Sequence, residues 1–99
     1  MDIRSFTGQE LKRRGLSPHR QGYGFLIDAV EMAYEKRTYY FPGISKRLYP
    51  DIARKQGVAS ACVEHSIRYS IRKASLSVTN SELILEIMNL FDIVNRPPK

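Results

Sequence analysis

The sequence of 99 residues has one cysteine, no tryptophan and no long apolar run. A single cysteine excludes a disulfide framework and a cysteine-cluster zinc site, and it favours a reducing, cytoplasmic setting. No apolar stretch approaches the roughly 20 residues that cross a bilayer. Residues 1–5 also lack the apolar stretch of a secretory signal. We therefore exclude a secreted mini-protein, a membrane protein and a multidomain enzyme.

Acidic residues are scarce relative to basic ones. The chain has 10 acidic and 16 basic residues, a net charge of +6, and hydrophobic residues make up 42%. Residues 44–75 alone hold seven basic and two acidic residues, which gives this segment a net charge of +5. Such an excess favours a polyanionic partner, although a solvated basic surface is the simpler alternative. We therefore expect the functional residues in this segment.

Helical spacing of apolar residues runs through most of the chain, and alternating strand patterns are nearly absent. We expect a loop at residues 38–43 from its Pro-Gly pair, and either a kink or a new helix start at Pro50. The pattern predicts an all-α fold, a compact bundle of about five helices that forms one domain over residues 1–99, with a frayed tail at 95–99. The predicted helices cover residues 7–15, 19–36, 44–56, 60–75 and 80–94.

The last predicted helix has an unusually wide apolar surface. Thr79 and Glu82 match the capping-box pattern, in which each residue accepts a hydrogen bond from the other's backbone N–H. Residues 80–94 are apolar on all but one narrow stripe. We therefore expect this helix either to be deeply wrapped by the fold or to be shared with a second subunit.

Residues 50–75 have the features of a helix-turn-helix. Gly57 ends one helix and permits the left-handed backbone of a sharp turn, and Ser60 is a suitable N-cap for the next helix. Ala53 is small, as required where two helices cross closely. In this motif the second helix enters the DNA major groove. The pattern alone is equally compatible with a plain helical bundle that has a basic face.

The outward face of helix 60–75 carries side chains suited to DNA. Arginine can bind guanine through two hydrogen bonds, glutamate accepts from cytosine, and histidine can donate to a base or a phosphate. Glu64 could instead simply pair with Arg68 one turn away, and the two interpretations are compatible. The candidates for backbone or flanking contacts are Lys46, Arg54, Lys55, Ser60, Ala61, Tyr69, Arg72 and Lys73.

Catalysis and metal binding find little support in the sequence. Cys62 and His65 are one turn apart, but only His19 remains as another imidazole, and two ligands do not make a stable zinc site. No spacing of Ser, His and Asp predicts a convergent catalytic group. We therefore expect no enzyme activity, no metal and no cofactor.

Three stretches within residues 15–75 carry a resemblance to a known family. They read GLSPHRQGYGFLIDAVEMAYE, ISKRLYPDIARKQGV and ACVEHSIRYSIRKA, and TNSELI near the last helix adds to them. The run LYPDIARK followed by VEHSIR is quite specific. With these motifs the chain resembles the C-terminal DNA-binding domain of the master sporulation transcription factor, the stage-zero sporulation protein A.

The resemblance implies an all-helical, cofactor-free domain that reads a short box in double-stranded DNA with the helix matching residues 60–75. It places Glu64, His65 and Arg68 at the family's base-reading positions. The chain departs from the family at Cys62 and His65, where the family typically has Arg, and at Tyr69, where it has His. The target therefore need not be the family's own box.

A second departure concerns the connection to the last helix. The family has a longer segment there, with an extra short helix that helps contact the sigma subunit of RNA polymerase. Residues 73–78 cross this gap directly. The resemblance therefore makes a polymerase contact doubtful and favours occlusion or repression over activation. We expect no receiver domain before residue 1, and hence not the family's control by phosphorylation, unless the chain is an excised piece of a longer protein.

These observations predict a sequence-specific transcriptional regulator that binds double-stranded DNA. One major-groove helix reads few base pairs, so we expect a homodimer or paired binding on DNA. The alternative is a protein-interaction module, or an antagonist of a related regulator, that uses the apolar helix 80–94 and binds DNA weakly or not at all.

Overall fold

The computed structural model describes residues 1–41 and 43–95, and it is helical with no strand in this part of the chain. The predicted all-α bundle is therefore confirmed. This part of the chain has five helices of 11 to 15 residues and one of four residues, which lies between the second and third of the longer helices. The helices are α1 (Ile3–Arg13), α2 (Gln21–Glu35), α3 (Arg37–Tyr40), α4 (Ile44–Gln56), α5 (Ser60–Lys73) and α6 (Asn80–Val94).

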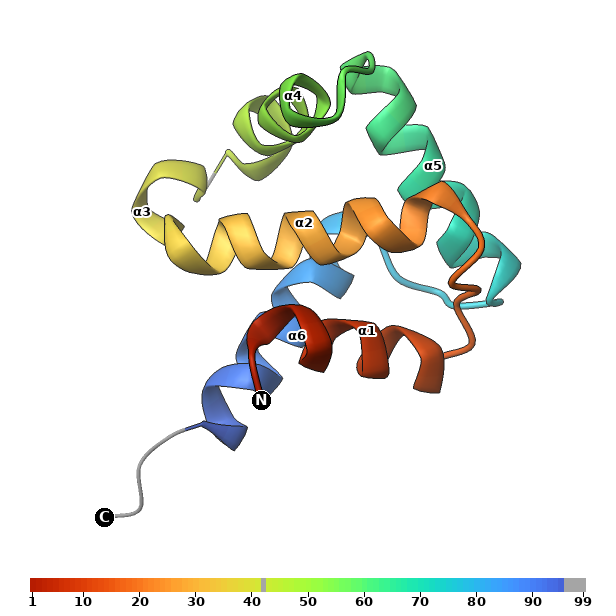
Figure 1. Cartoon of the computed structure of the whole chain (residues 1–99), viewed down its shortest axis with the longest axis vertical. Coiled ribbons are helices and arrows are strands. Elements are labelled where there is room, and N and C mark those ends of the chain that lie inside the picture. Colours follow the sequence, from red (N-terminus) through yellow and green to blue (C-terminus); the bar gives the residue numbers. More distant parts are fainter. Residues whose placement is uncertain (42, 96–99) are drawn as a thin grey trace.

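Helix α2 lies at the centre of the bundle. Figure 1 shows α2 crossing the middle of the molecule, with α4 and α1 on opposite sides, α5 along one end and α6 behind. Because α2 is covered from several sides, it buries more than the single stripe that the sequence suggests. Phe25 and Ala29 are buried in addition to Leu26, Val30 and Ala33. This central helix is the scaffold on which α5 rests.

Helix α1 begins four residues earlier than the sequence pattern predicts. The carboxylate of Asp2 accepts a hydrogen bond from the Ser5 backbone N–H at 2.8 Å, which caps the helix before Ile3. Ile3 and Leu11 are buried at the two ends of its inner face. The helix stops before Gly15, whose φ of +93° is the left-handed conformation expected of a terminating glycine.

The prediction of a loop over residues 38–43 is wrong for residues 38–40, which are helical. The N–H of Tyr40 donates to the Lys36 carbonyl, and residues 37–40 form the single turn α3. Tyr40 is 2% exposed and its hydroxyl donates to Asp51 at 2.7 Å, so tertiary packing pulls this turn onto α4. Burial, followed by the Asp51 contact, raises the pKa of Tyr40 to about 12. Residue 42 of the expected loop lies outside the described residues.

Helix α4 runs through Pro50 without interruption, so the alternative of a new helix start there is wrong. Proline removes one backbone hydrogen bond inside a helix, and packing must offset that loss. Leu48 and Ile52 are fully buried on either side of Pro50, and Tyr49 and Ala53 are nearly so. The inner face of α4 therefore stays on the core despite the missing bond.

Helix α6 matches its predicted start. Thr79 Oγ1 accepts from the Glu82 N–H at 3.1 Å, and Glu82 Oε1 accepts from the Thr79 N–H at 2.9 Å, so the capping box is confirmed. Residues 74–79, between α5 and α6, contain no helix, as expected for a chain without the family's extra short helix. Asn95 is the C-cap of α6, and the remainder of the expected frayed tail, 96–99, lies outside the described residues.

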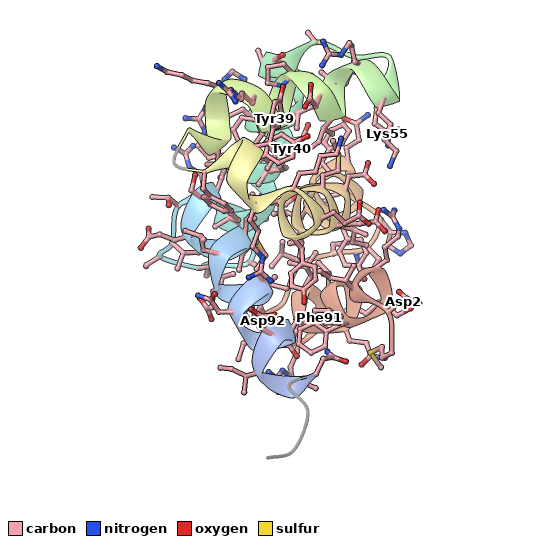
Figure 2. The ribbon with its side chains drawn as sticks, turned by 90° about the vertical axis from the view of Figure 1, so that its left-hand side faces the viewer. Asp2, Tyr39, Tyr40, Lys55, Phe91 and Asp92 are labelled. Atoms are coloured by element: carbon pink, nitrogen blue, oxygen red, sulfur yellow. The ribbon has the colours of Figure 1, made fainter. Side chains whose placement is uncertain are left out.

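The wide apolar surface of α6 is only partly covered by the fold. Leu83, Ile84, Ile87 and Met88 are buried against the core. The exposed apolar side chains of α6 are Leu85, Ile93 and Val94, at 38%, 62% and 67%. Phe91 packs edge-on against Phe6 of α1 and Tyr34 of α2, and beside it Asp92 pairs with Arg37 at 3.1 Å (Figure 2).

Candidate nucleic-acid interface

The turn between α4 and α5 has the geometry that the sequence predicts. Gly57 follows α4 with φ +70° and ψ +35°, and both its N–H and that of Val58 donate to the Ala53 carbonyl. Ala53 is 4% exposed at this corner, and Val63 of α5 is fully buried behind it. Together α4, the turn and α5 form a helix-turn-helix.

The N-cap of α5 differs from the sequence prediction. Ala59, not Ser60, has the extended N-cap conformation, with φ −79° and ψ +149°, and Ser60 is already the first helical residue. A serine in the first turn has helical dihedrals, so its side chain does not serve as the cap. Ala59 offers no side-chain oxygen, and the first amides of α5 therefore have no side-chain partner.

One ridge of α5 is fixed by a very close approach to α2. A Cβ atom added at Gly22 would lie 2.2 Å from the Ser66 carbonyl oxygen and 2.3 Å from Ser70 Oγ. Val63, Ile67 and Ile71 complete this buried ridge. Ser70 Oγ is buried and has no hydrogen-bond partner in the described part of the chain. A glycine is therefore required where the two backbones meet.

A second contact fixes the middle of α5 to α6 and α4. The side-chain amide of Asn80 donates to the backbone carbonyl of Glu64 at 3.2 Å. Tyr49 of α4 is 5% exposed beside it, and burial raises the pKa of this phenol despite opposing hydrogen bonds with Asn80 and Ser81. Helix α5 is thus held from both sides with its remaining ridge facing outward.

The structure brings the three predicted base-reading residues together on that outward ridge. Glu64, His65 and Arg68 are on adjacent turns, and His65 and Arg68 are exposed. The side chains of Arg68 and Glu64 retain 47% and 44% exposure, and their charged groups are 3.4 Å apart. The expected Glu64–Arg68 pair is therefore present, and an exposed pair of this kind contributes only a few tenths of a kcal/mol.

An open hollow lies on this ridge and has no carboxylate in its wall. It is about 590 Å³ in volume and is lined by His65, Ser66, Arg68, Tyr69 and Arg72. A neighbouring groove of about 670 Å³ is lined by Glu64, Arg68 and Arg72 of α5 and by residues 76–82, which include Glu82. The hollow therefore presents cations and hydrogen-bond donors to any anion that approaches α5.

Two of the three predicted flanking residues of α4 lie near acidic partners. Arg54 pairs with Asp51, and its side chain remains 76% exposed. Lys55 Nζ lies 3.4 Å from the buried carboxylate of Asp28 and is half exposed. Figure 2 shows Lys55 at the outer edge of the molecule. Lys46 is exposed on α4. All three cations can still reach an external phosphate.

Asp28 is a residue that the sequence analysis missed. It is 2% exposed and joins three elements, accepting from Arg4 of α1 at 2.9 Å and from Gln56 of α4 at 2.6 Å. Burial acts to raise the pKa of Asp28, but these hydrogen bonds and the Lys55 charge hold it below its ordinary value. The sequence did contain a signal for Asp28, since it is an aspartate within the apolar stripe of a predicted helix. A buried carboxylate needs hydrogen-bonding or charged partners, so contacts to other elements could have been expected.

Arg20 is the second missed residue. Its guanidinium lies 5.0 Å from the centre of the Tyr69 ring, and Lys73 Nζ lies 5.6 Å from the same ring. Figure 1 shows the connection between α1 and α2 passing beside the end of α5. No local pattern could reveal this contact, because it joins residues that are far apart in the sequence.

Metal and membrane sites find no support in the described residues. Across residues 1–41 and 43–95, no three His, Cys, Asp or Glu side chains gather as potential metal ligands. Within the same part of the chain, each helix is too short or too polar to span a bilayer.

The bundle, the helix-turn-helix and the exposed basic ridge of α5 define a protein of the helix-turn-helix DNA-binding class. Residues 7–93 match the family described as the C-terminal domain of the sporulation initiation factor Spo0A, and the chain belongs to this family. The family comprises DNA-binding effector domains of a sporulation transcription regulator and is not a family of enzymes.

Proposed function

We propose that this protein is a sequence-specific transcriptional regulator that inserts α5 into the major groove of double-stranded DNA. The observation that carries the proposal is the pair of opposite ridges on α5. One ridge is packed against α2 at Gly22, and the other carries the exposed His65 and Arg68 and the half-exposed Glu64. A rigidly held helix with outward polar side chains is what direct reading of base edges requires.

Each of the three residues has a distinct role in this proposal. Arg68 donates two hydrogen bonds to a guanine, and Glu64 accepts from a cytosine amino group. Their present separation of 3.4 Å keeps the Arg68 guanidinium close to the carboxylate before DNA binds. His65 donates to a base or to a phosphate from the neighbouring turn.

The cations around this ridge hold the DNA backbone. Arg72 and Lys73 extend α5, and the first amides of the helix at Ser60 and Ala61 have no side-chain cap to compete with a phosphate. Lys46, Arg54 and Lys55 flank them on α4, where the first helix of the motif crosses the backbone. Such contacts raise affinity for all sequences and make it salt-dependent.

Two copies bind in this proposal, one at each of two half-sites about one helical turn apart. The exposed Leu85, Ile93 and Val94 of α6 are the apolar surface on which a second copy would pack. With no helix in residues 74–79, where the family's additional helix would lie, repression by occlusion is favoured over activation. The action is that of a cytoplasmic regulator without a cofactor.

Selection of bound duplexes from a random pool, followed by sequencing, tests this function. The selected duplex then serves in fluorescence anisotropy titrations with a scrambled duplex as the reference. Arg68→Ala should weaken binding to the selected duplex by about 1–3 kcal/mol and leave the scrambled duplex nearly unaffected. Arg37→Ala removes the same charge at the start of α3. Figure 1 shows α3 at the end of α2 away from α5, so this variant should change the binding of neither duplex.

The protein-interaction alternative predicts another result. Its supporting observation is the exposed apolar surface of α6. A DNA-independent complex in light scattering that Leu85→Lys and Leu90→Lys abolish, together with a selection that enriches no motif, would replace the DNA proposal by this one.

A further inference from the structure

We infer that Arg20 is a DNA-backbone contact that Tyr69 holds in place, so that the connection between α1 and α2 binds phosphate alongside α5. This inference rests on the proposed function. It adds an element outside the helix-turn-helix, 49 residues before Tyr69 in the sequence. The arrangement that carries it is the cation–π contact in which the Arg20 guanidinium lies 5.0 Å from the centre of the Tyr69 ring.

A cation–π contact leaves most donors of an arginine free. A guanidinium carries five N–H donors, so contact with one ring still leaves others open for a phosphate. The ring also fixes the direction of a long side chain that would otherwise lose conformational freedom on binding. Tyr69 is itself half exposed, at 50%, on the edge of the cationic hollow.

Arg20 belongs to the arginines without a carboxylate partner. In the described part of the chain Arg20, Arg47 and Arg72 have no such partner, whereas Arg4, Arg14 and Arg37 are each bound to at least one acidic side chain at 2.7–3.1 Å. Of the three, Arg47 contacts Tyr39 on α3, and Arg20 and Arg72 lie beside Tyr69 of α5. An unpaired cation needs no partner exchange before it meets a phosphate. Lys73, on the same ring, is likewise unpaired among these residues.

The position of Arg20 is fixed by the backbone as well as by the ring. Arg20 is the N-cap of α2, two residues before Gly22, whose close approach to Ser66 and Ser70 anchors the start of α2 on α5. The N–H of Arg20 donates to the Ser17 carbonyl at 3.2 Å. The side chain therefore emerges beside the second half of α5, where Arg72 and Lys73 also lie.

Salt-dependent titrations test the inference. The logarithm of the binding constant falls with the logarithm of salt concentration by about 0.9 per phosphate contact, so Arg20→Ala should reduce the slope by about 0.9 per bound copy. The ratio of affinities for selected and scrambled duplexes should stay constant, because a phosphate contact carries no base preference. Arg20→Gln, which keeps a polar side chain but removes the charge, should give the same loss.

The dependence on Tyr69 is tested by repeating Arg20→Ala in two backgrounds. In Tyr69→Phe, which keeps the ring, Arg20→Ala should still remove the full slope increment. In Tyr69→Leu the same substitution should lower the salt slope much less, because the Arg20 side chain has already lost the ring that holds it. Equal losses in the two backgrounds overturn the role of the ring.

The outcomes separate this inference from the proposed function. Loss of specific binding in Arg68→Ala with an unchanged salt slope in Arg20→Ala and Arg20→Gln overturns the Arg20 contact alone. A lower melting temperature in Arg20→Ala with an unchanged salt slope would show that the contact with Tyr69 only stabilises the fold. This result also overturns the Arg20 contact with DNA. If Arg68→Ala leaves specific binding intact, the placement of α5 itself is wrong.

Discussion

Gly22→Ala tests the packing that presents α5. The new Cβ would lie 2.2 Å from the Ser66 carbonyl oxygen, and ordinary contact begins at 3.4 Å, so the two backbones must separate by up to 1.2 Å (3.4 minus 2.2). The Ser70 hydroxyl, at 2.3 Å, can rotate away, but the Ser66 carbonyl is backbone, so this part of the strain cannot be relieved by a side-chain rotation. Overpacking of a core costs about 1–3 kcal/mol, and alanine returns about 0.5–1 kcal/mol in helix propensity.

The net expectation for Gly22→Ala is a loss of about 1 kcal/mol in the free energy of unfolding. For a chain of this size that corresponds to a fall of about 4–8 °C in Tm. Urea denaturation followed by far-ultraviolet circular dichroism measures the free energy. The variant should also bind the selected duplex more weakly than its remaining folded fraction explains, because α5 and Arg20 are displaced together.

Gly24→Ala is the matched control for this prediction. A Cβ atom at Gly24 meets nothing within 4 Å, although it lies on the same helix two residues away. This variant should be more stable than the original chain by about 0.5–1 kcal/mol. Equal stability of Gly22→Ala and Gly24→Ala would refute the argued contact between α2 and α5.

Three further predictions concern stability. Thr79→Ala removes the capping box of α6 and should cost about 1 kcal/mol in urea denaturation; no change would mean that the cap is dispensable. Ser70→Ala removes a buried hydroxyl without a described partner and should raise stability by about 1 kcal/mol, whereas a loss would reveal a partner. The pKa of Asp28 is lowered on folding, so its contribution is full above the unfolded value near 3.8 and is lost as pH falls through the folded pKa. The stability difference between the original chain and Asp28→Asn should therefore be constant above that pH and shrink below it, and a constant difference throughout would contradict this.

Most helices could be predicted because their signals are local. The capping box at Thr79, the apolar spacing of α5 and the terminating Gly57 each act within a few residues, and the structure has them where the sequence indicates. The early start of α1 was missed because the cap at Asp2 precedes the apolar pattern. The turn α3 was missed because burial of Tyr40 outweighs the loop signal of the Pro-Gly pair.

In the candidate site too, features set by local sequence could be predicted and contacts between helices could not. Glu64, His65 and Arg68 share a ridge because helical spacing dictates it, so the sequence could place them together. The contacts of Asp28 with Arg4 and Gln56, and of Arg20 with Tyr69, join separate helices and depend on how these pack. The predicted N-cap of α5, Ser60, is one residue after the observed N-cap, Ala59. Side-chain preferences alone do not resolve a difference of one residue.

Backbone amide chemical shifts, followed by nuclear magnetic resonance as the selected duplex is added, test the central claim most directly. The account predicts the largest changes along residues 60–73, with a second group at Arg20 and its neighbours, and small changes on the far end of α2. Changes concentrated on α6, or equally small changes everywhere at saturating DNA, would contradict the placement of α5 in the major groove.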